Sequence, residues 1–441
     1  MVNKMKGLTK ETVKEISHQK KEPEWMRKFR LKALEVFQDK KMPSFGPDLK
    51  ELDLSEINFY LRPEVIHANR WENLPADIRQ TYEKLKIPEI ERKYLAGSLA
   101  QYESEAVYEK LKKTWEKQGI IFVDMDTAVE KYPKLVKQYF MKLVPPEDNK
   151  FAALHGAVWS GGTFVYIPKG VCVCLPMQAY FRMQSERMGQ FEHTLIIADE
   201  GSFVHYLEGC TAPVYSTASL HAGVVEIYVK DNARVRYTTV QNWSKNVYNL
   251  NTKRAHVGQN GRIEWVSGSL GSKVTMLYPG SMLVGSGASS QHLSISWAGK
   301  GQVKDTGGKV THLAENTSST ILSKSIAIGG GKTTFRGLVK VEKRATGVKS
   351  HMRCESLILD KHSQAESFPS LDVKEHDVSV GHEATVGKIS EDQLFYLQTR
   401  GISEKEATNL IVSGFIEPIV SEIPLEYAVE LNRLIQMEME S

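Results

Sequence analysis

The chain lacks the features of a secreted or membrane-spanning protein. Only four of its 441 residues are cysteines, too few for a disulfide framework and suited to a reducing compartment. The first 25 residues contain no apolar run, which argues against a secretory signal. No stretch approaches the length of about 18 uncharged apolar residues that a membrane span needs. We therefore expect a cytoplasmic protein without membrane contact.

The chain also lacks an excess of either charge. Lys and Arg number 57 against 53 Asp and Glu, a balance of +4, which gives no electrostatic reason to expect nucleic acid as a partner. Hydrophobic residues make up 41% and charged residues 25%, a composition typical of globular proteins. A phosphate loop is absent as well, because the run that ends in Gly331-Lys332-Thr333 has Ile326 where the motif needs glycine.

The composition divides the chain into three regions. Residues 1–150 are rich in Lys, Glu and Leu and predict a mostly helical region, with Trp25, Phe29 and Ala33 on one face of an amphipathic helix. Residues 81–117 have a similar composition and predict further helix. The pattern changes to period two in residues 151–389, and returns to helix in residues 390–441.

The middle region predicts a stacked β-structure. Strands such as residues 163–167, 202–206 and 234–240 are β-branched and aromatic. Polar turns at Gly201, Asn232 and Gly261 recur at a nearly constant spacing of roughly 30 residues, without helices between them. A repeat of this length indicates a parallel β-helix. A β-sandwich is the alternative, because its short strands and regular turns give a similar pattern.

The C-terminal region predicts three helices. Ser390 and Ser403 each begin a capping box, Gly401 ends the first helix, and the last helix is expected from Leu425 to Met437. Pro424 separates the last two. Such a unit would cap the open edge of a solenoid or form a docking surface.

Two cysteines carry no recognisable motif. Cys172 and Cys174 are two residues apart, so on a strand they would face the same way, and no CxxC pattern occurs. Burial as small apolar residues is the simpler interpretation, and metal ligation is the alternative.

Cys354 stands in a more polar environment. Arg353 precedes it and would favour a thiolate, while His382 follows at close to one repeat length, with Glu383 beside it. Thiolate, imidazole and carboxylate on adjacent coils suit iron or zinc. His382 and Glu383 would nevertheless point to opposite faces of a strand unless a bulge intervenes. A half-buried strand thiol without function is the alternative.

The same spacing surrounds Cys210. Arg182 precedes it and Gln241 follows it, each at close to one repeat length, with Trp243 and Lys253 shortly after. A buried polar column is costly unless its groups bond one another, so such a column indicates a functional passage. A surface column of no consequence is the alternative.

Several runs of residues resemble one known family. They are residues 22–26 (EPEWM), 101–105 (QYESE), 198–201 (ADEG), 206–213 (YLEGCTAP), 240–243 (VQNW), 252–255 (TKRA), 381–385 (GHEAT) and 400–403 (RGIS). Together, and in this order, they make the chain similar to the SufB/SufD family of the SUF system for iron–sulfur cluster assembly. The YLEGC and VQNW runs resemble the SufB members in particular.

The resemblance implies a fold and a set of partners. The fold would be a right-handed parallel β-helix between helical N- and C-terminal regions. The C-terminal helices would dock the ATPase SufC, the β-helix would pair with SufD or a second SufB, and sulfur would come from a SufS donor with SufE or SufU. The chain would be a scaffold rather than an enzyme, because the partner hydrolyses ATP. Its cargo would be iron and a nascent 4Fe-4S or 2Fe-2S cluster. A reduced flavin is associated with the family's complexes, but no motif of this sequence indicates one.

The resemblance also implies roles for individual residues. Cys210 resembles the thiol that first receives persulfide sulfur. The residues that resemble the lining of the sulfur route are Arg182, Glu192, Gln241, Trp243 and Lys253. The residues that resemble the cluster-building site at the subunit interface are Cys354, Glu383 and His382. The chain departs from the family at Gln184, where asparagine is frequent, and lacks the N-terminal cysteine cluster of some members.

Two other functions fit parts of the sequence. A β-helix enzyme acting on carbohydrate would set carboxylates along a groove, but Asp is sparse on the predicted strands and no signal peptide is seen. A purely structural, SufD-like subunit would not need the thiols of Cys210 and Cys354.

Overall fold

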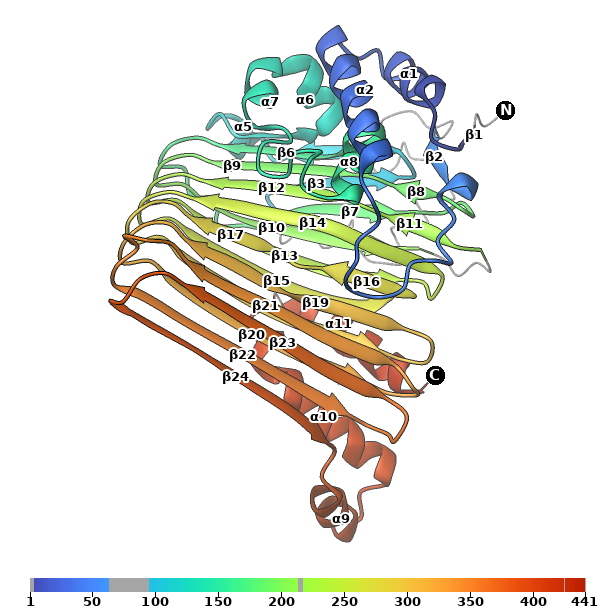
Figure 1. The fold of residues 1–441 in the computed structure, drawn as a ribbon, viewed down its shortest axis with the longest axis vertical. Helices are drawn as coiled ribbons and strands as arrows, with labels where there is room; N and C mark the ends of the chain where they lie inside the picture. The colour runs from blue at the N-terminus through green and yellow to red at the C-terminus, as the bar shows by residue number, and fades with distance from the viewer. Residues whose placement is uncertain (1–3, 63–94, 213–216, 424, 441) are drawn as a thin grey trace.

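The computed structural model describes residues 4–62, 95–212, 217–423 and 425–440. Within these residues the chain winds into a parallel β-solenoid with helices on two of its sides (Figure 1). The strands run nearly the full width of the solenoid, and each coil contributes strands to two facing sheets.

The described strands form two large sheets and one small one. The ten-stranded sheet has the order β24 (Val378–Lys388), β22 (Val348–Ile358), β20 (Ser318–Ala327), β18 (Ser289–Ala298), β15 (Arg262–Gly271), β13 (Arg234–Trp243), β10 (Phe203–Thr211), β7 (Met177–Arg182), β3 (Gly97–Tyr102), β4 (Glu105–Leu111). The twelve-stranded sheet has the order β23 (Gln364–Val373), β21 (Lys332–Val341), β19 (Val303–His312), β16 (Val274–Leu277), β14 (Val247–Val257), β12 (Val224–Val229), β9 (His193–Ala198), β6 (Gly162–Ile167), β5 (Ile121–Asp124), and also contains β8 (Gly189–Gln190), β11 (Ser219–His221) and β17 (Gly280–Leu283). The small sheet pairs β1 (Lys4–Lys6) with β2 (Asn58–Leu61).

The pairing between successive coils confirms the parallel β-solenoid and excludes the β-sandwich. β10 pairs with β13 in parallel and without a register shift, and so does every later neighbour in the ten-stranded sheet. A β-sandwich would pair its strands antiparallel. Residues one coil apart therefore lie side by side and share a face.

The turns explain the repeat seen in the sequence. In six successive coils one residue adopts a left-handed backbone at the same corner, where glycine and asparagine are tolerated best. These residues are Gly201, Asn232, Asn260, Gly287, Asn316 and Gly347. In the third of these turns the left-handed residue is Asn260, one position before the glycine that the sequence pattern singled out.

The inner faces of the two sheets form the main core. In the ten-stranded sheet, aromatic side chains of successive coils contact one another: the ring centroids of Tyr206 and Tyr237 are 5.6 Å apart, and those of Tyr237 and Trp265 are 5.2 Å apart. Because strand side chains alternate between faces, the residues two positions away along each strand also point inward. This alternation places polar residues inside the solenoid.

The N-terminal region combines helices and strands. Its described helical segments are α1 (Lys10–Gln19), α2 (Glu24–Asp39), η1 (Leu54–Glu56), α5 (Lys113–Glu116), α6 (Met125–Lys131), α7 (Pro133–Tyr139) and α8 (Lys150–Val158). Phe140 and Trp159 pack with Leu195 and Ile197 on the outer face of the twelve-stranded sheet. These contacts fix the N-terminal helices to one side of the solenoid.

The expectation of helix over residues 81–117 was wrong for residues 97–111. This segment forms β3 and β4, and β3 is buried between β4 and β7. Pairing with β7, which lies far along the chain, overrides the local Lys- and Glu-rich composition. Residues 81–94 lie outside the described part of the chain.

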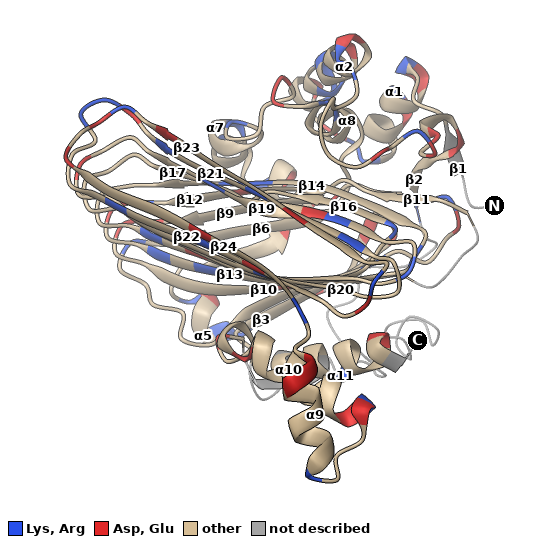
Figure 2. Ribbon diagram, turned by 60° about the horizontal axis from the view of Figure 1, so that its bottom comes forward, with Lys and Arg blue, Asp and Glu red and all other residues tan. Residues whose placement is uncertain are grey.

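The C-terminal helices do not cap the end of the solenoid, as one interpretation of the sequence had it. They are α9 (Glu391–Thr399), α10 (Glu404–Val420) and α11 (Leu425–Glu440). Helices α10 and α11 lie against the outer face of the ten-stranded sheet, whereas α9 contacts α10 and projects away from the sheet (Figure 2). Val412, Ile416 and Leu431 pack there against Leu293 and Trp297. The last coil, β23 and β24, is left largely exposed. Pro418 lies inside α10 near its end, and Pro424 is outside the described residues.

The charged residues show no concentration of one sign. Figure 2 shows Lys and Arg interspersed with Asp and Glu along the strands and turns, in keeping with the small net charge of the chain. No helix among the described residues combines the length and apolar character needed to cross a membrane.

Replacing Leu431 by alanine should weaken the packing of α11 on the sheet. Leu431 is fully buried, and a side chain on Gly268 of β15 would lie 3.2 Å from its Cδ1. We expect Leu431→Ala to lower the free energy of unfolding by about 2–5 kcal/mol, measured by urea denaturation. Leu410→Ala on α10 is the matched control: Leu410 is 54% exposed, so its loss should change stability by no more than about 0.5 kcal/mol. Equal effects would contradict this packing.

Candidate functional site

Cys210 lies inside the solenoid on β10. Tyr206, Glu208 and Cys210 alternate inward along this strand, and Cys210 is 2% exposed. Its neighbour on the next coil is Gln241 of β13. The expected pairing of Cys210 with Gln241 is thus present in the structure.

Arg182 does not share this column. The register pairs Cys210 with Phe181 and Thr211 with Arg182, so Arg182 is one residue out of the expected alignment and points to the other face of β7. Its Nε donates to Gln184 Oε1 at 3.0 Å. The residue that lies one coil before Cys210 is Phe181 and not Arg182, so this coil is one residue longer than the sequence spacing suggested. The sequence alone does not show the length of an individual coil.

Three chemically different ligand groups meet at the thiol. One ligand atom from each of Glu192, Cys210 and His221 lies within 4.8 Å of the others, and all three residues are buried. His221 Nε2 contacts Glu192 Oε1 directly. In the described part of the chain, this is the one group of three or more His, Cys, Asp or Glu with such close ligand atoms.

The other nitrogen of His221 is held by asparagines. Its Nδ1 is 2.8 Å from Asn249 Oδ1 and 3.2 Å from Asn251 Nδ2. The indole ring of Trp243 lies beside the imidazole, with centroids 4.5 Å apart. Asn249 Nδ2 in turn donates to Gln241 Oε1 at 2.6 Å, which joins this group to the strand after Cys210.

Lys253 and Glu208 form a buried ion pair next to the thiol. Lys253 Nζ donates to Glu208 Oε1 at 3.1 Å and to Tyr237 Oη at 2.9 Å. Thr239 Oγ1 donates to the same carboxylate at 3.3 Å, and the Cys210 thiol faces it with Sγ 4.0 Å away. Burial raises the pKa of Cys210 well above its usual value, and the carboxylates of Glu208 and Glu192 add to the effect.

Several buried polar atoms of this cluster have no hydrogen-bond partner among the described residues. They are Glu192 Oε2, Glu208 Oε2, Gln241 Nε2 and Trp243 Nε1. Unsatisfied buried groups are costly, so their concentration around one thiol indicates a site that receives a further atom or ion.

From this cluster, two columns of mostly hydroxyl side chains follow the inner face of the ten-stranded sheet from one coil to the next. The first column continues from Glu208 through Thr239, Ser267, Ser294 and Ser323 to Cys354. The second column continues from Cys210 through Gln241, Ser269, Ser296 and Ser325 to Ser356. Each residue pairs directly with the next across neighbouring strands. The two buried cysteines therefore lie at opposite ends of two adjacent columns, Cys210 at the start of the second and Cys354 at the end of the first.

Contacts with the opposite sheet show that these hydroxyls face the interior. Ser296 Oγ is 3.0 Å from Thr306 Oγ1, and Ser325 Oγ donates to Thr333 Oγ1 at 3.2 Å. Lys304, also from the opposite sheet, donates to Ser272 Oγ at 2.5 Å, and burial lowers its pKa to about 7. The interior is therefore polar over several successive coils.

Cys354 ends the first column close to the exposed last coil. Its thiol is 2% exposed and lies 3.3 Å from Ser367 Oγ of β23. Burial raises its pKa, while the hydroxyls of Ser367 and Ser356 lower it in part. Arg353 does not assist the thiolate as the sequence suggested, because it points to the other face and pairs with Glu355 at 2.5 Å.

The register separates the two residues expected to join Cys354. Cys354 pairs with Ala384, so His382 lies on the same face two residues along, and Glu383 lies on the opposite face beside Arg353. Glu383 Oε2 is 3.7 Å from Arg353 Nε. No bulge interrupts β22 and β24, so only one of the two residues shares the face of Cys354, as the alternation along a strand predicted, and that residue is His382.

Cys172 and Cys174 are exposed, contrary to the simpler interpretation of the sequence. They lie in the loop before β7. The backbone of Cys172 forms an isolated β-bridge with Phe203, and Val173, which stands between the two cysteines, is buried. Their alternation was correctly expected, but it turns both thiols outward.

Little in the sequence pointed to His221, Glu208 and Asn249. Glu208 could have been found, because it stands two residues before Cys210 and so shares its face. His221 and Asn249 come from the opposite sheet, and only the packing of the two sheets brings them to the thiol.

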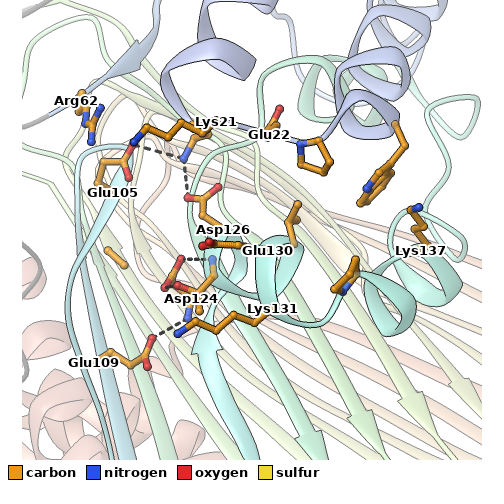
Figure 3. Close-up of a pocket in the computed structure, with 17 residues that line it drawn as sticks. Lys21, Glu22, Arg62, Glu105, Glu109, Asp124, Asp126, Glu130, Lys131 and Lys137 are labelled. Carbon is orange, nitrogen blue, oxygen red and sulfur yellow. Dashed lines mark hydrogen bonds and ion pairs between the residues drawn. The ribbon is translucent and has the colours of Figure 1, made fainter.

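A cavity of about 1050 Å³ lies elsewhere, between the N-terminal helices and β4 (Figure 3). Its charged groups are largely paired: Lys20 Nζ is 2.6 Å from Asp126 Oδ2, and the backbone N–H of Asp124 donates to Glu109 Oε2 at 3.0 Å. Burial raises the pKa of both Glu109 and Asp126 to about 7. The residues lining it include no cysteine or histidine.

The four thiols should react with an alkylating reagent at very different rates. Cys172 and Cys174 are exposed and should react first, whereas Cys210 and Cys354 are buried and have raised pKa values. We expect mass spectrometry of the native protein at neutral pH to find iodoacetamide on the first pair only, with labelling of the second pair increasing as the pH rises. Early labelling of Cys210 would contradict the buried site.

Comparison with known proteins identifies the family. Residues 181–415 match the model described as "SUF system FeS cluster assembly, SufBD core domain", and residues 5–179 match the SufBD N-terminal region. Iron–sulfur cluster assembly SufBD family proteins of Staphylococcus aureus strain MRSA252 and of Staphylococcus haemolyticus are each 56% identical over 435 residues, which covers 99% of this chain and 94% of theirs. The chain therefore belongs to the SufBD family of the SUF iron–sulfur cluster assembly system.

Proposed function

We propose that the chain is the SufB-type scaffold of the SUF system, which accepts persulfide sulfur at Cys210 and builds a nascent cluster at Cys354. The observation that carries the proposal is the pair of adjacent polar columns on the inner face of the ten-stranded sheet, one beginning at Cys210 and the other ending at Cys354. A purely structural SufD-like subunit would have no need of two thiols joined through its interior, which favours the SufB type.

The cluster around Cys210 suits thiol chemistry. Transfer requires the thiolate of Cys210 to attack the outer sulfur of a donor persulfide, so that the donor S–S bond breaks, a new one forms at Cys210, and the donor leaves as a thiolate. The thiol proton can pass to the Glu208 carboxylate, which the thiol faces and whose Oε2 has no partner among the described residues. Lys253 stabilises the negative charge that remains in the buried site.

The hydroxyl columns suit passage between the two cysteines. Ser267 and Ser294 face inward and yet are only half-buried, which indicates that side chains do not fill the interior at these coils. Together with Glu192, Gln241, Trp243 and Lys253 near the entrance, they would form the sulfur route. Arg182, on the other face of β7, would act outside the interior.

The site at Cys354 would be completed by another subunit. One chain offers the thiol and, two residues along on the same face, His382, while Glu383 points away. Iron, the cargo, is held by thiolate with imidazole or carboxylate ligands. The exposed apolar side chains of the last coil, Phe368, Leu371 and Val386, would lie against SufD or a second copy of the chain.

The C-terminal helices would dock the ATPase SufC. Phe395 and Tyr396 of α9 are 68% and 58% exposed, and Leu410 of α10 is 54% exposed, although the opposite face of α10 is buried on the sheet. Such exposed apolar side chains on a short helical unit mark an interaction site. ATP hydrolysis by SufC would then control release of the cluster, in the cytoplasm, with a SufS-type donor supplying sulfur.

Removing each thiol in turn should distinguish the acceptance of sulfur at Cys210 from the assembly of a cluster at Cys354. We expect Cys210→Ala to abolish sulfur transfer to the scaffold from a persulfide donor. We expect Cys354→Ala to leave loading of Cys210 intact and to abolish cluster accumulation, without loss of folded structure. The assay is anaerobic reconstitution with iron and a persulfide donor, followed by visible absorption and by mass spectrometry of sulfur adducts. Normal iron and sulfide content in Cys354→Ala would refute the site.

Blocking the interior should slow the passage of sulfur to Cys354 and leave its acceptance at Cys210 unchanged. Ser323 faces inward next to Cys354, and Ser323→Val would replace its one hydroxyl with two methyl groups, which removes a polar group and narrows the interior at this coil. We expect sulfur to reach Cys210 normally and Cys354 more slowly. The control is Thr320→Val on the same strand, because Thr320 is exposed and lies outside the columns. Equal rates in the two variants would argue against passage through the interior.

A further inference from the structure

We propose that Glu192, Cys210 and His221 form a buried binding site for one divalent metal ion of the Fe²⁺ or Zn²⁺ class. This goes beyond the acceptance of sulfur, because it assigns a metal to the interior of the solenoid, away from Cys354 and the last coil. The inference depends on the geometry of the three ligand groups and stands whether or not Cys210 receives sulfur.

The ligand set is of the right kind. A thiolate, an imidazole and a carboxylate are the donors that Zn²⁺ and Fe²⁺ accept together, whereas Mg²⁺ and Ca²⁺ prefer oxygen alone. The three donor atoms lie within 4.8 Å of one another, close enough for small side-chain movements to bring all three to one ion. Each comes from a different segment: Glu192 precedes β9, Cys210 is on β10, and His221 is on β11.

The surroundings of His221 prepare it for coordination. A metal-binding histidine usually donates its second N–H to an oxygen, which fixes the tautomer and aims the free nitrogen at the ion. Asn249 Oδ1, 2.8 Å from His221 Nδ1, is placed to accept that hydrogen. With the ring proton on Nδ1, the lone pair of Nε2 is free for the ion, which would replace the hydrogen bond that Nε2 otherwise donates to Glu192 Oε1.

Glu192 supplies the independent evidence for a ligand. Its Oε1 contacts His221, but its Oε2 is buried and has no hydrogen-bond partner among the described residues. Glu192 as a whole is only 3% exposed. An ion between the three groups would occupy this oxygen and neutralise a carboxylate that is otherwise costly to bury.

Proton balance is simple. When the ion binds, the Cys210 thiol loses one proton, and the sulfur coordinates as a thiolate. No electron is transferred. With Glu192 bound through both oxygens, the ion would have four protein donors, and with one oxygen it would retain a position for an incoming sulfur.

Cobalt is a direct probe of this site. The full-length protein, made metal-free under anaerobic conditions, would be titrated with Co²⁺ alone. We expect one equivalent to produce a thiolate-to-cobalt charge-transfer band in the near ultraviolet and the intense visible bands of a tetrahedral ion. Cys210→Ser should lose the charge-transfer band. Glu192→Gln should weaken binding by about 10–100-fold or more, and Asn249→Ala by about 10–100-fold.

Matched variants exclude the other thiols. Cys354→Ser and the double variant Cys172→Ser/Cys174→Ser should retain the full signal, because neither touches the site. A second measurement covers the case in which Cys210→Ser is unstable: Zn²⁺ should raise the melting temperature of the unmodified protein and have a much smaller effect on Glu192→Gln. A charge-transfer band that survives in Cys210→Ser, or that disappears in either control variant, would overturn the proposal.

The result is separable from the proposed function. Sulfur loading of Cys210 by a persulfide donor can be measured on the same metal-free protein. If Cys210 accepts sulfur but no cobalt band forms, the metal site is refuted and the scaffold function stands. If cobalt binds but no sulfur is accepted, the metal site stands and the role of Cys210 as acceptor fails.

Discussion

The parallel pairing of one coil with the next underlies every other feature of this molecule. Because β10, β13, β15, β18, β20 and β22 pair in register, every side chain lies directly beside its counterparts on the neighbouring coils. A residue type repeated once per coil thus becomes a continuous column. This is how single serines, far apart in the sequence, become two adjacent polar columns, one beginning at Cys210 and the other ending at Cys354.

A polar interior has a thermodynamic cost, and the structure meets it in two ways. Most inward hydroxyls and amides bond one another, as in the contacts of Ser296 with Thr306 and of Asn249 with Gln241. The aromatic column of Tyr206, Tyr237 and Trp265 supplies apolar contact on the same inner face. Around Cys210 the compensation is incomplete: Glu192 Oε2, Glu208 Oε2, Gln241 Nε2 and Trp243 Nε1 have no partner within the described part of the chain, and an incoming sulfur or metal ion would lie close to them.

Different helices cover the outer faces of the two large sheets, and the last coil remains uncovered. The N-terminal helices cover the twelve-stranded sheet, and the C-terminal helices cover the ten-stranded sheet. Neither group covers the last coil, so β23 and β24 keep their exposed edge and apolar side chains. An exposed strand edge is a ready surface for pairing with another chain. The thiol of Cys354 lies just inside this edge.

The solenoid could be predicted before any coordinates, because the period-two strands and the turns near Gly201, Asn232 and Asn260 follow from local rules. Cys210, Gln241 and Cys354 could be singled out as well, since the coil length can be counted along the chain. Which residues meet them depends on the packing of the folded chain. Coils differ in length by a residue or two, and a shift of one residue turns a side chain to the other face, as at Arg182 and Glu383. His221 and Glu192 reach Cys210 across the gap between two sheets, and a contact between sheets leaves no periodic trace in the sequence.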